Sequence, residues 1–287
     1  MDELTPVGLE PESTRTGQIC HYPEMPASAP NRPVSISLIA VQEVSAAIVY
    51  SLHEVFGSVG MVWEAVTGEA IKTRQITPRI VGRSTKPIRT TFNATLVPDH
   101  TFTEKHRSDV VIVGDLFLND GAGPAGRWRK EIAWICDQYD RGAIVCSVCT
   151  GSMMLAEAGL LAGREATTHW SARRIFEDCY PQVLLQPERL LVPCGVEHRI
   201  VTSGGSATWT ELALYLVARF SGEAEARRIA KIFLFGDRSD GQLPFAVMAR
   251  PKQHDDGVIA NCQEWIADHY AVANPVSRMA AKSGLAE

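Results

Sequence analysis

The sequence predicts an α/β fold in which a mainly parallel sheet is covered by helices on both faces. The first observation is that short apolar runs typical of buried strands alternate with stretches whose apolar residues recur at helical spacing. The second is the composition, with 45% hydrophobic and 21% charged residues, which is ordinary for a globular protein. At 287 residues the chain is long enough for one large or two modest domains.

The N-terminal half begins with residues 1–32, which are rich in Pro, Ser, Thr and Glu and predict a disordered leader. The apolar runs that follow predict strands, in order, at residues 34–41, 80–81, 95–97 and 109–115. Helical spacing predicts a helix over Val44 to Val59. A second helix is expected to start at Pro124, which suits a first helical turn, and to run to about Tyr139.

The next part of the chain, up to Phe220, continues the alternation. Strands are predicted, in order, at residues 142–146, 166–167, 190–193 and 199–203, and the last two read as a hairpin. Helices are predicted after Gly151, over residues 171–178 and over residues 212–220. Thr208 to Glu211 matches a capping box in front of the last of these helices.

The region after residue 250 differs from the rest. We predict an α/β domain over residues 33–250, a polar linker from Pro251, and a short α-helical tail that completes residues 251–287. The tail carries one amphipathic helix from Val258 to Tyr270, and Asn274-Pro275 separates it from a second.

Charge, hydropathy and cysteine usage narrow the function classes. A net charge of −5 gives no general attraction to nucleic acid or to an anionic membrane. No apolar stretch approaches the roughly 20 residues of a membrane span, and the N-terminus lacks the features of a signal peptide. Seven cysteines without paired spacing indicate reduced thiols in the cytoplasm. We expect no metal, no cofactor and no membrane partner.

Residues 146–170 hold the most informative pattern, C-S-V-C-T-G-S-M-M-L-A-E-A-G-L-L-A-G-R-E-A-T-T-H-W. An apolar strand runs into Cys149, and a short apolar helix follows Gly151, whose small size permits a sharp turn. Such a turn exposes the sulfur, and the helix N-terminus favours the thiolate. We therefore expect Cys149 to be the most reactive thiol, with His169 as a base or orienting partner and Thr150 assisting.

A lone cysteine in an apolar strand is more often a core residue, and Cys146 is interpreted in that way. Cys146 and Cys149 form a C-x-x-C pair, but a zinc site would need a second such pair or a His pair. A thioredoxin-like couple is disfavoured because the second cysteine, and not the first, opens the helix.

The elbow segment resembles that of the DJ-1/PfpI superfamily, in particular the GlxA-type regulators, in which such a domain is fused to an AraC-type DNA-binding domain. The resemblance covers about residues 34–235 and includes D-V-V-I-V-G-D, R-I-V-T-S-G-G-S-A-T-W-T-E-L-A-L and I-A-K-I-F-L-F-G-D-R-S-D-G-Q-L-P-F-A. It implies a flavodoxin-like three-layer sandwich of the class I glutamine amidotransferase-like type, which usually dimerises. The tail segment P-V-S-R-M-A-A-K-S-G-L-A-E resembles the first helix and turn of an AraC-type helix-turn-helix; the alternative is that the tail only packs on the main domain.

Two departures from the family pattern concern electrostatics. Enzymes of the superfamily carry an acid near the start of the first helix, and the matching place here is Ile48, with Glu43 and Glu54 on either side. The oxyanion turn, usually Gly-Gly, reads Gly114-Asp115. Both changes argue against full catalytic competence. The candidate ligand-binding residues are Gly114, Asp115, Gly151 and Glu54.

Three functions remain open. The leading hypothesis is the ligand-sensing and dimerisation domain of a GlxA/AraC-type regulator that ends before its DNA-reading helices. The second is a cysteine-dependent enzyme, resembling isonitrile hydratases or amidase-like members, with Cys149 as the nucleophile. The third is a redox sensor in which Cys149 is reversibly oxidised. The expected partners are a small-molecule ligand of unknown identity and a second copy of the chain. DNA is expected only if the missing C-terminal helices are present.

Overall fold

The computed structural model describes residues 32–118, 122–236, 257–269 and 272–283. Its central feature is a seven-stranded sheet with the order β10-β11-β7-β6-β1-β2-β5. Neighbouring strands are parallel except β10, which is antiparallel to β11. The strands are β1 (Val34–Ile39), β2 (Ile76–Gly82), β5 (His100–Thr101), β6 (Val110–Val113), β7 (Ile144–Val148), β10 (Leu191–Cys194) and β11 (Ile200–Ser203). The α/β class and the parallel-dominated sheet are confirmed.

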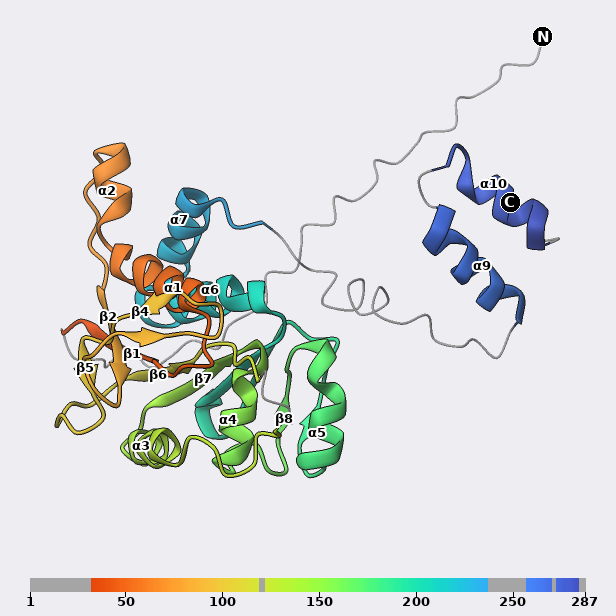
Figure 1. Cartoon of the computed structure of the whole chain (residues 1–287). Helices are drawn as coiled ribbons and strands as arrows, with labels where there is room; N and C mark the ends of the chain where they lie inside the picture. Colours follow the sequence, from red (N-terminus) through yellow and green to blue (C-terminus); the bar gives the residue numbers. More distant parts are fainter. Residues whose placement is uncertain (1–31, 119–121, 237–256, 270–271, 284–287) are drawn as a thin grey trace, which may run out of the picture.

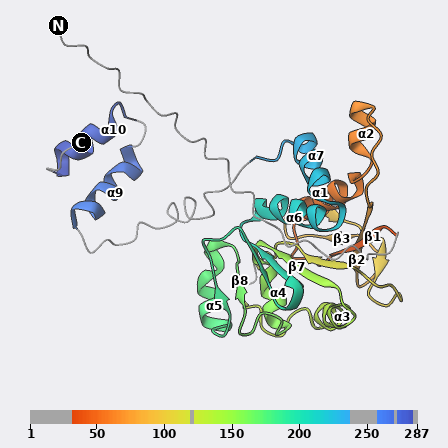
Figure 2. The ribbon, with the colours of Figure 1, turned by 180° about the vertical axis from the view of Figure 1, so that it is seen from behind.

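Helices cover both faces of this sheet, as Figures 1 and 2 show from opposite sides. One face carries α1 (Ala46–Ser58), α6 (Trp209–Ser221) and α7 (Glu223–Phe233). The other face carries α3 (Arg129–Asp140) and α4 (Ser152–Glu157). The three layers of a flavodoxin-like sandwich are therefore present. Smaller elements complete the domain: α2 (Val62–Thr67), α5 (Arg173–Cys179), and the two-stranded sheets β3 (Ile88–Arg89) with β4 (Thr95–Leu96) and β8 (Glu165–Ala166) with β9 (Leu184–Leu185).

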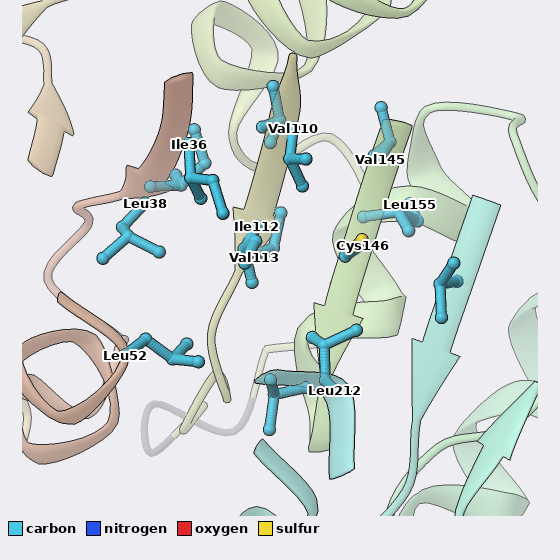
Figure 3. Packing of buried hydrophobic residues seen from close by; sticks show 14 of the residues in the cluster. Ile36, Leu38, Leu52, Val110, Ile112, Val113, Val145, Cys146, Leu155 and Leu212 are labelled. Carbon is cyan, nitrogen blue, oxygen red and sulfur yellow. The ribbon is translucent and has the colours of Figure 1, made fainter. Parts of the chain in front are cut away.

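The core lies on both sides of the central strands. Every residue of β1, β6, β7 and β11 is buried. Figure 3 shows side chains from β1, β6 and β7 packed against Leu52 of α1, Leu155 of α4 and Leu212 of α6. Cys146 belongs to this packing and is fully buried, as its place in an apolar strand predicts.

Two local predictions were wrong. Helix α3 begins at Arg129 and not near Pro124, because Gly126 and Trp128 have positive φ angles (73° and 53°) that are incompatible with a continuous helix. The capping box at Thr208 does not form, since its hydroxyl donates to the carbonyl of Gly205 and makes no cap hydrogen bond. Helices α2 and α7 and strands β3, β5 and β9 were not predicted, and all of these except α7 are too short for a periodic pattern.

The C-terminal region contains α9 (Gly257–His269) and α10 (Pro275–Ser283), which contact each other. Both agree with the helices predicted on either side of Asn274-Pro275. The leader up to residue 31 and the linker over residues 251–256 lie outside the described residues, so the domain boundaries remain predictions. In the part of the chain that the structure describes, no helix is long and apolar enough to cross a membrane.

Candidate functional site

Cys149 stands where β7 turns into α4. It opens a short 3-10 turn, Cys149–Gly151, and its φ of 56° lies in the left-handed region that L-residues rarely adopt. This is the strained strand-to-helix elbow that the sequence predicts. However, Cys149 is only 3% exposed. The expectation of an exposed sulfur was therefore wrong.

Gly151 is required for a different reason from the one the sequence suggested. Its own backbone is helical, with φ of −57°, so the turn does not need a glycine there for conformational freedom. A Cβ at this position would lie 2.2 Å from the carbonyl oxygen of Gly114 and 2.6 Å from that of Val113. Gly151 thus allows the elbow to contact the end of β6 directly.

Asp115, in the loop that follows β6, brings a carboxyl group to the elbow. It is 2% exposed, and its Oδ1 accepts a hydrogen bond of 3.3 Å from the backbone N–H of Ser45, the residue that precedes α1. Helix α1 has no acidic residue in its first turn, so Asp115 places a carboxyl at this helix end from outside the helix. Burial is the dominant effect on Asp115 and raises its pKa from 3.8 to about 6.

The thiol of Cys149 has two hydroxyl neighbours. Ser206 Oγ lies 3.4 Å from Sγ and Thr150 Oγ1 lies 3.8 Å from it. Burial raises the pKa of Cys149, and the negative charge of Asp115 raises it further, while the bond from Ser206 and the backbone of Thr150 act in the opposite direction. The net direction is upward, so the helix end does not make this thiol acidic. The expected preference for thiolate was wrong.

Ser206 connects the thiol with the carboxyl group. Its side chain hydrogen-bonds to Sγ of Cys149, and a hydrogen bond from the same side chain lowers the pKa of Asp115. One hydroxyl hydrogen serves only one acceptor at a time. When Asp115 is protonated, it can donate to Ser206 while Ser206 donates to the sulfur, which gives a path for a proton. Sequence reasoning missed Ser206, although it follows strand β11 at the same sheet edge.

Thr150 joins the elbow to the loop after β6. Its hydroxyl accepts a hydrogen bond from the N–H of Leu116 and donates one to the carbonyl of the same residue, both at 2.8 Å. Because these two bonds use the donor and one acceptor site of the hydroxyl, its principal contacts are with the neighbouring loop and not with the sulfur.

The segment that carries His169 contacts the elbow, but the imidazole ring hydrogen-bonds to Ser171 and not to Cys149. Thr168 donates to the carbonyl of Cys149, which ties this segment to the elbow. The Nδ1 of His169 is 2.7 Å from Ser171 Oγ, and burial lowers the pKa of the ring. Among the described residues, no hydrogen bond joins His169 to Cys149. The two residues do not form a nucleophile–base pair in this structure.

Of the remaining residues considered in the sequence, Ile48 lies at the site, whereas Glu43 and Glu54 do not contact the thiol. Ile48 does lie at the site, because a Cβ at Gly114 would be 4.0 Å from its Cγ2. Glu43 pairs with Arg127 at 3.5 Å. Glu54 is exposed on α1, nine residues beyond Ser45 and therefore roughly 13 Å along the helix from that residue, whose N–H meets Asp115. The structure does not bring Glu54 to the other site residues.

A cavity of about 380 Å³ lies at the same edge of the sheet, beyond the ends of β1 and β2. It is lined by residues 40–42, which follow β1, by the ion pairs Arg83–Glu131 and Arg127–Glu43, and by Trp128. The indole Nε1 of Trp128 is buried and has no hydrogen-bond partner within the described chain. Cys149 does not line this cavity. In the described residues, no three His, Cys, Asp or Glu side chains are placed to hold a metal ion.

Comparison with known proteins shows which family this chain belongs to. The sequence pattern of the DJ-1/PfpI family matches residues 61–219, which is more than half of the 287 residues. The chain belongs to the DJ-1/PfpI family. An AraC family transcriptional regulator from Pseudomonas putida has the same fold, with a TM-score of 0.53 at 15% identity over 70% of this chain and 100% of that one.

Two relatives are similar to part of this chain. The HTH-type transcriptional regulator CdhR of Pseudomonas aeruginosa is 35% identical over 105 residues, which are 37% of this chain and 30% of CdhR. An isonitrile hydratase of Pseudomonas putida is 29% identical over 150 residues, which are 52% of this chain and 62% of the hydratase. The chain therefore spans less than two thirds of either relative.

Proposed function

We propose that this chain is the ligand-sensing and dimerisation domain of a GlxA/AraC-type transcriptional regulator. The observation that carries the proposal is the closed elbow: Cys149 is 3% exposed and its pKa is raised. A nucleophilic enzyme needs an accessible thiolate. The similarity to CdhR supports a regulator, and the similarity to an AraC family regulator of known structure supports only the shared fold.

A sensor also needs a place for its ligand. We assign this role to the cavity beside Trp128, whose volume of about 380 Å³ suits a small molecule. The indole N–H of Trp128 is buried beside this cavity without a partner, and a ligand that opened the cavity toward it would supply the missing acceptor. Gly114, Asp115 and Gly151, which are ligand-binding candidates from the sequence, do not line this cavity. Dimerisation is expected from the family, and DNA is a partner only through a complete helix-turn-helix.

The ligand cavity is tested by a thermal-shift screen of small polar metabolites against the native chain and two variants. Trp128→Phe keeps an aromatic ring but removes the N–H, so the shift given by a bound compound should fall. Trp170→Phe, outside the lining of the cavity, is the matched control. Equal shifts in all three proteins would contradict the assignment. Light scattering tests the dimer, since a mass near 31.4 kDa would indicate a monomer.

A cysteine-dependent enzyme is the second candidate, and Asp115 is the observation that favours it. A buried carboxyl with a pKa of about 6 can exchange a proton near neutral pH, and Ser206 connects it to the sulfur. The test is incubation with an isonitrile and detection of the formamide made by adding water. We expect no product above that of a Cys149→Ala control. Product that depends on Cys149 would overturn the sensor in favour of the hydratase.

A further inference from the structure

A second cavity lies at the opposite edge of the sheet. Its volume is about 430 Å³, and it is placed where β1 and β2 begin and where the chain approaches β6. Because β1, β2, β6 and β7 are parallel, their first residues share one edge, and the elbow at the end of β7 lies at the other. The lining is strongly basic: Arg32, Pro33, Ser35, Thr77, Arg79, His106 and Arg107.

The charges in this cavity are not balanced. Arg32 makes a bidentate pair with Asp109, at 2.8 and 2.7 Å, and Asp109 also accepts the backbone N–H of Ser35 at 2.8 Å. That carboxylate is therefore already neutralised. Within the described residues, neither Arg79 nor Arg107 forms an ion pair or a side-chain hydrogen bond. The cavity thus holds two uncompensated positive charges on a chain whose net charge is −5.

Hydrogen-bonding capacity is also left unused here. Ser35 is 7% exposed, yet its hydroxyl has no hydrogen-bond partner in the described chain, and neither ring nitrogen of His106 has one. Burial lowers the pKa of His106, and the positive charges of Arg79 and His100 lower it further, against an opposing effect of Glu104. Buried polar groups without partners are rare and destabilising unless something satisfies them.

We propose that this cavity binds a phosphate monoester dianion. The two guanidinium groups balance the two negative charges of the dianion. Each guanidinium can also donate two parallel hydrogen bonds to a pair of phosphoryl oxygens. The Ser35 hydroxyl is buried at the cavity wall and lacks a partner, so a phosphoryl oxygen that reached it would accept its hydrogen bond. The cavity is larger than a phosphate alone and leaves room for a small esterified group. The site is separate from the elbow, so the proposal does not depend on the function of Cys149.

The test uses glycerol phosphate as the probe and sodium chloride of equal ionic strength as the reference. Isothermal titration of the full chain should show saturable binding to the phosphate monoester. Heating experiments should show a concentration-dependent rise in melting temperature that chloride does not reproduce. Arg79→Gln with Arg107→Gln should abolish both effects. Arg174→Gln, which removes an 85% exposed arginine far from the cavity lining, is the matched control and should change neither.

Ser35→Ala separates a ligand role from a structural role. Without phosphate this variant should melt at the native temperature or above, because it removes an unsatisfied buried hydroxyl. With phosphate it should bind about tenfold more weakly, as expected for one lost hydrogen bond to a charged group. Binding that survives the double arginine variant would overturn the proposal. So would a lack of saturable binding, or binding of duplex DNA but not of glycerol phosphate, which would identify a nucleic-acid contact instead.

Discussion

Asp115 is a buried carboxyl beside the elbow, and its titration differs from that of an ordinary aspartate. Its pKa is about 6 in the folded chain, against an ordinary value of 3.8. Between these pH values the folded chain holds a proton that the unfolded chain has lost. The contribution of Asp115 to the free energy of unfolding is therefore largest at low pH and declines as the pH rises through about 6, by about 3 kcal/mol in total.

Replacing Asp115 with Asn should remove this decline, because an amide does not ionise. We expect the free energy of unfolding of Asp115→Asn, measured by urea denaturation, to gain on that of the native chain between pH 4 and pH 7.5. The same substitution should lower the pKa of Cys149, followed by thiolate absorbance, since it removes a negative charge that raises that pKa. Asp178→Asn, at an exposed carboxyl, is the control. An unchanged thiol titration would show that Asp115 does not act on the sulfur.

Cys179 and not Cys149 should be the first of the described thiols to react. Cys179 is exposed, whereas Cys149 is buried and its pKa is raised. In a Cys20→Ser background, limiting iodoacetamide should label Cys179 at least about tenfold faster than Cys149, as measured by peptide mapping. Mild peroxide should follow the same order. Preferential modification of Cys149 in the native chain would restore the redox-sensor hypothesis.

Sequence reasoning located the site residues better than it described their environment. The elbow at Cys149 and the edge of the sheet were predictable, because a strand followed by a helix leaves a local pattern. The burial of the sulfur, the hydroxyl of Ser206 and the turn of His169 toward Ser171 were not, because each depends on a contact between distant segments. Asp115 was recognised as unusual, but only the fold shows that it meets the first turn of α1.

At the scale of elements, the contact between the elbow and the end of β6 is the tightest constraint. A methyl group on residue 151 would overlap two carbonyl oxygens at 2.2 and 2.6 Å, and backbone atoms cannot move aside cheaply. We expect Gly151→Ala to lower the free energy of unfolding by at least about 3 kcal/mol in urea denaturation. Gly123→Ala, where no atom lies within 4 Å, should change it by less than about 0.5 kcal/mol. Similar stabilities for the two variants would refute the close approach.

Helix boundaries show where local sequence signals stop being sufficient. The strands were found because they are continuous apolar runs that are buried on both faces. The start of α3 was missed because the proline signal at residue 124 was overridden by two left-handed residues, Gly126 and Trp128. A tryptophan in that conformation is not predictable from helix propensity, and the side chain of Trp128 is buried in the fold.

For the whole molecule, the core predicts which part of the chain is independently stable. The hydrophobic cluster of the described residues ends at Phe235, and α9 and α10 contribute no residue to it. A fragment of residues 32–236 should therefore fold, and its melting temperature should lie within about 2 °C of that of the full chain. Scanning calorimetry of both proteins measures this. A loss of more than about 5 °C would support the alternative in which the tail packs on the α/β domain.

The double hydrogen bond between Thr150 and Leu116 has a consequence for how the site is observed. It links segments 34 residues apart in sequence. Together with the close approach of Gly151 to Gly114, it couples the elbow to the loop after β6. Whatever displaces Asp115 also displaces the sulfur. The rate at which an alkylating reagent modifies Cys149 should therefore change when the loop after β6 moves. Measuring this rate reports movement of that loop without adding a label to the protein.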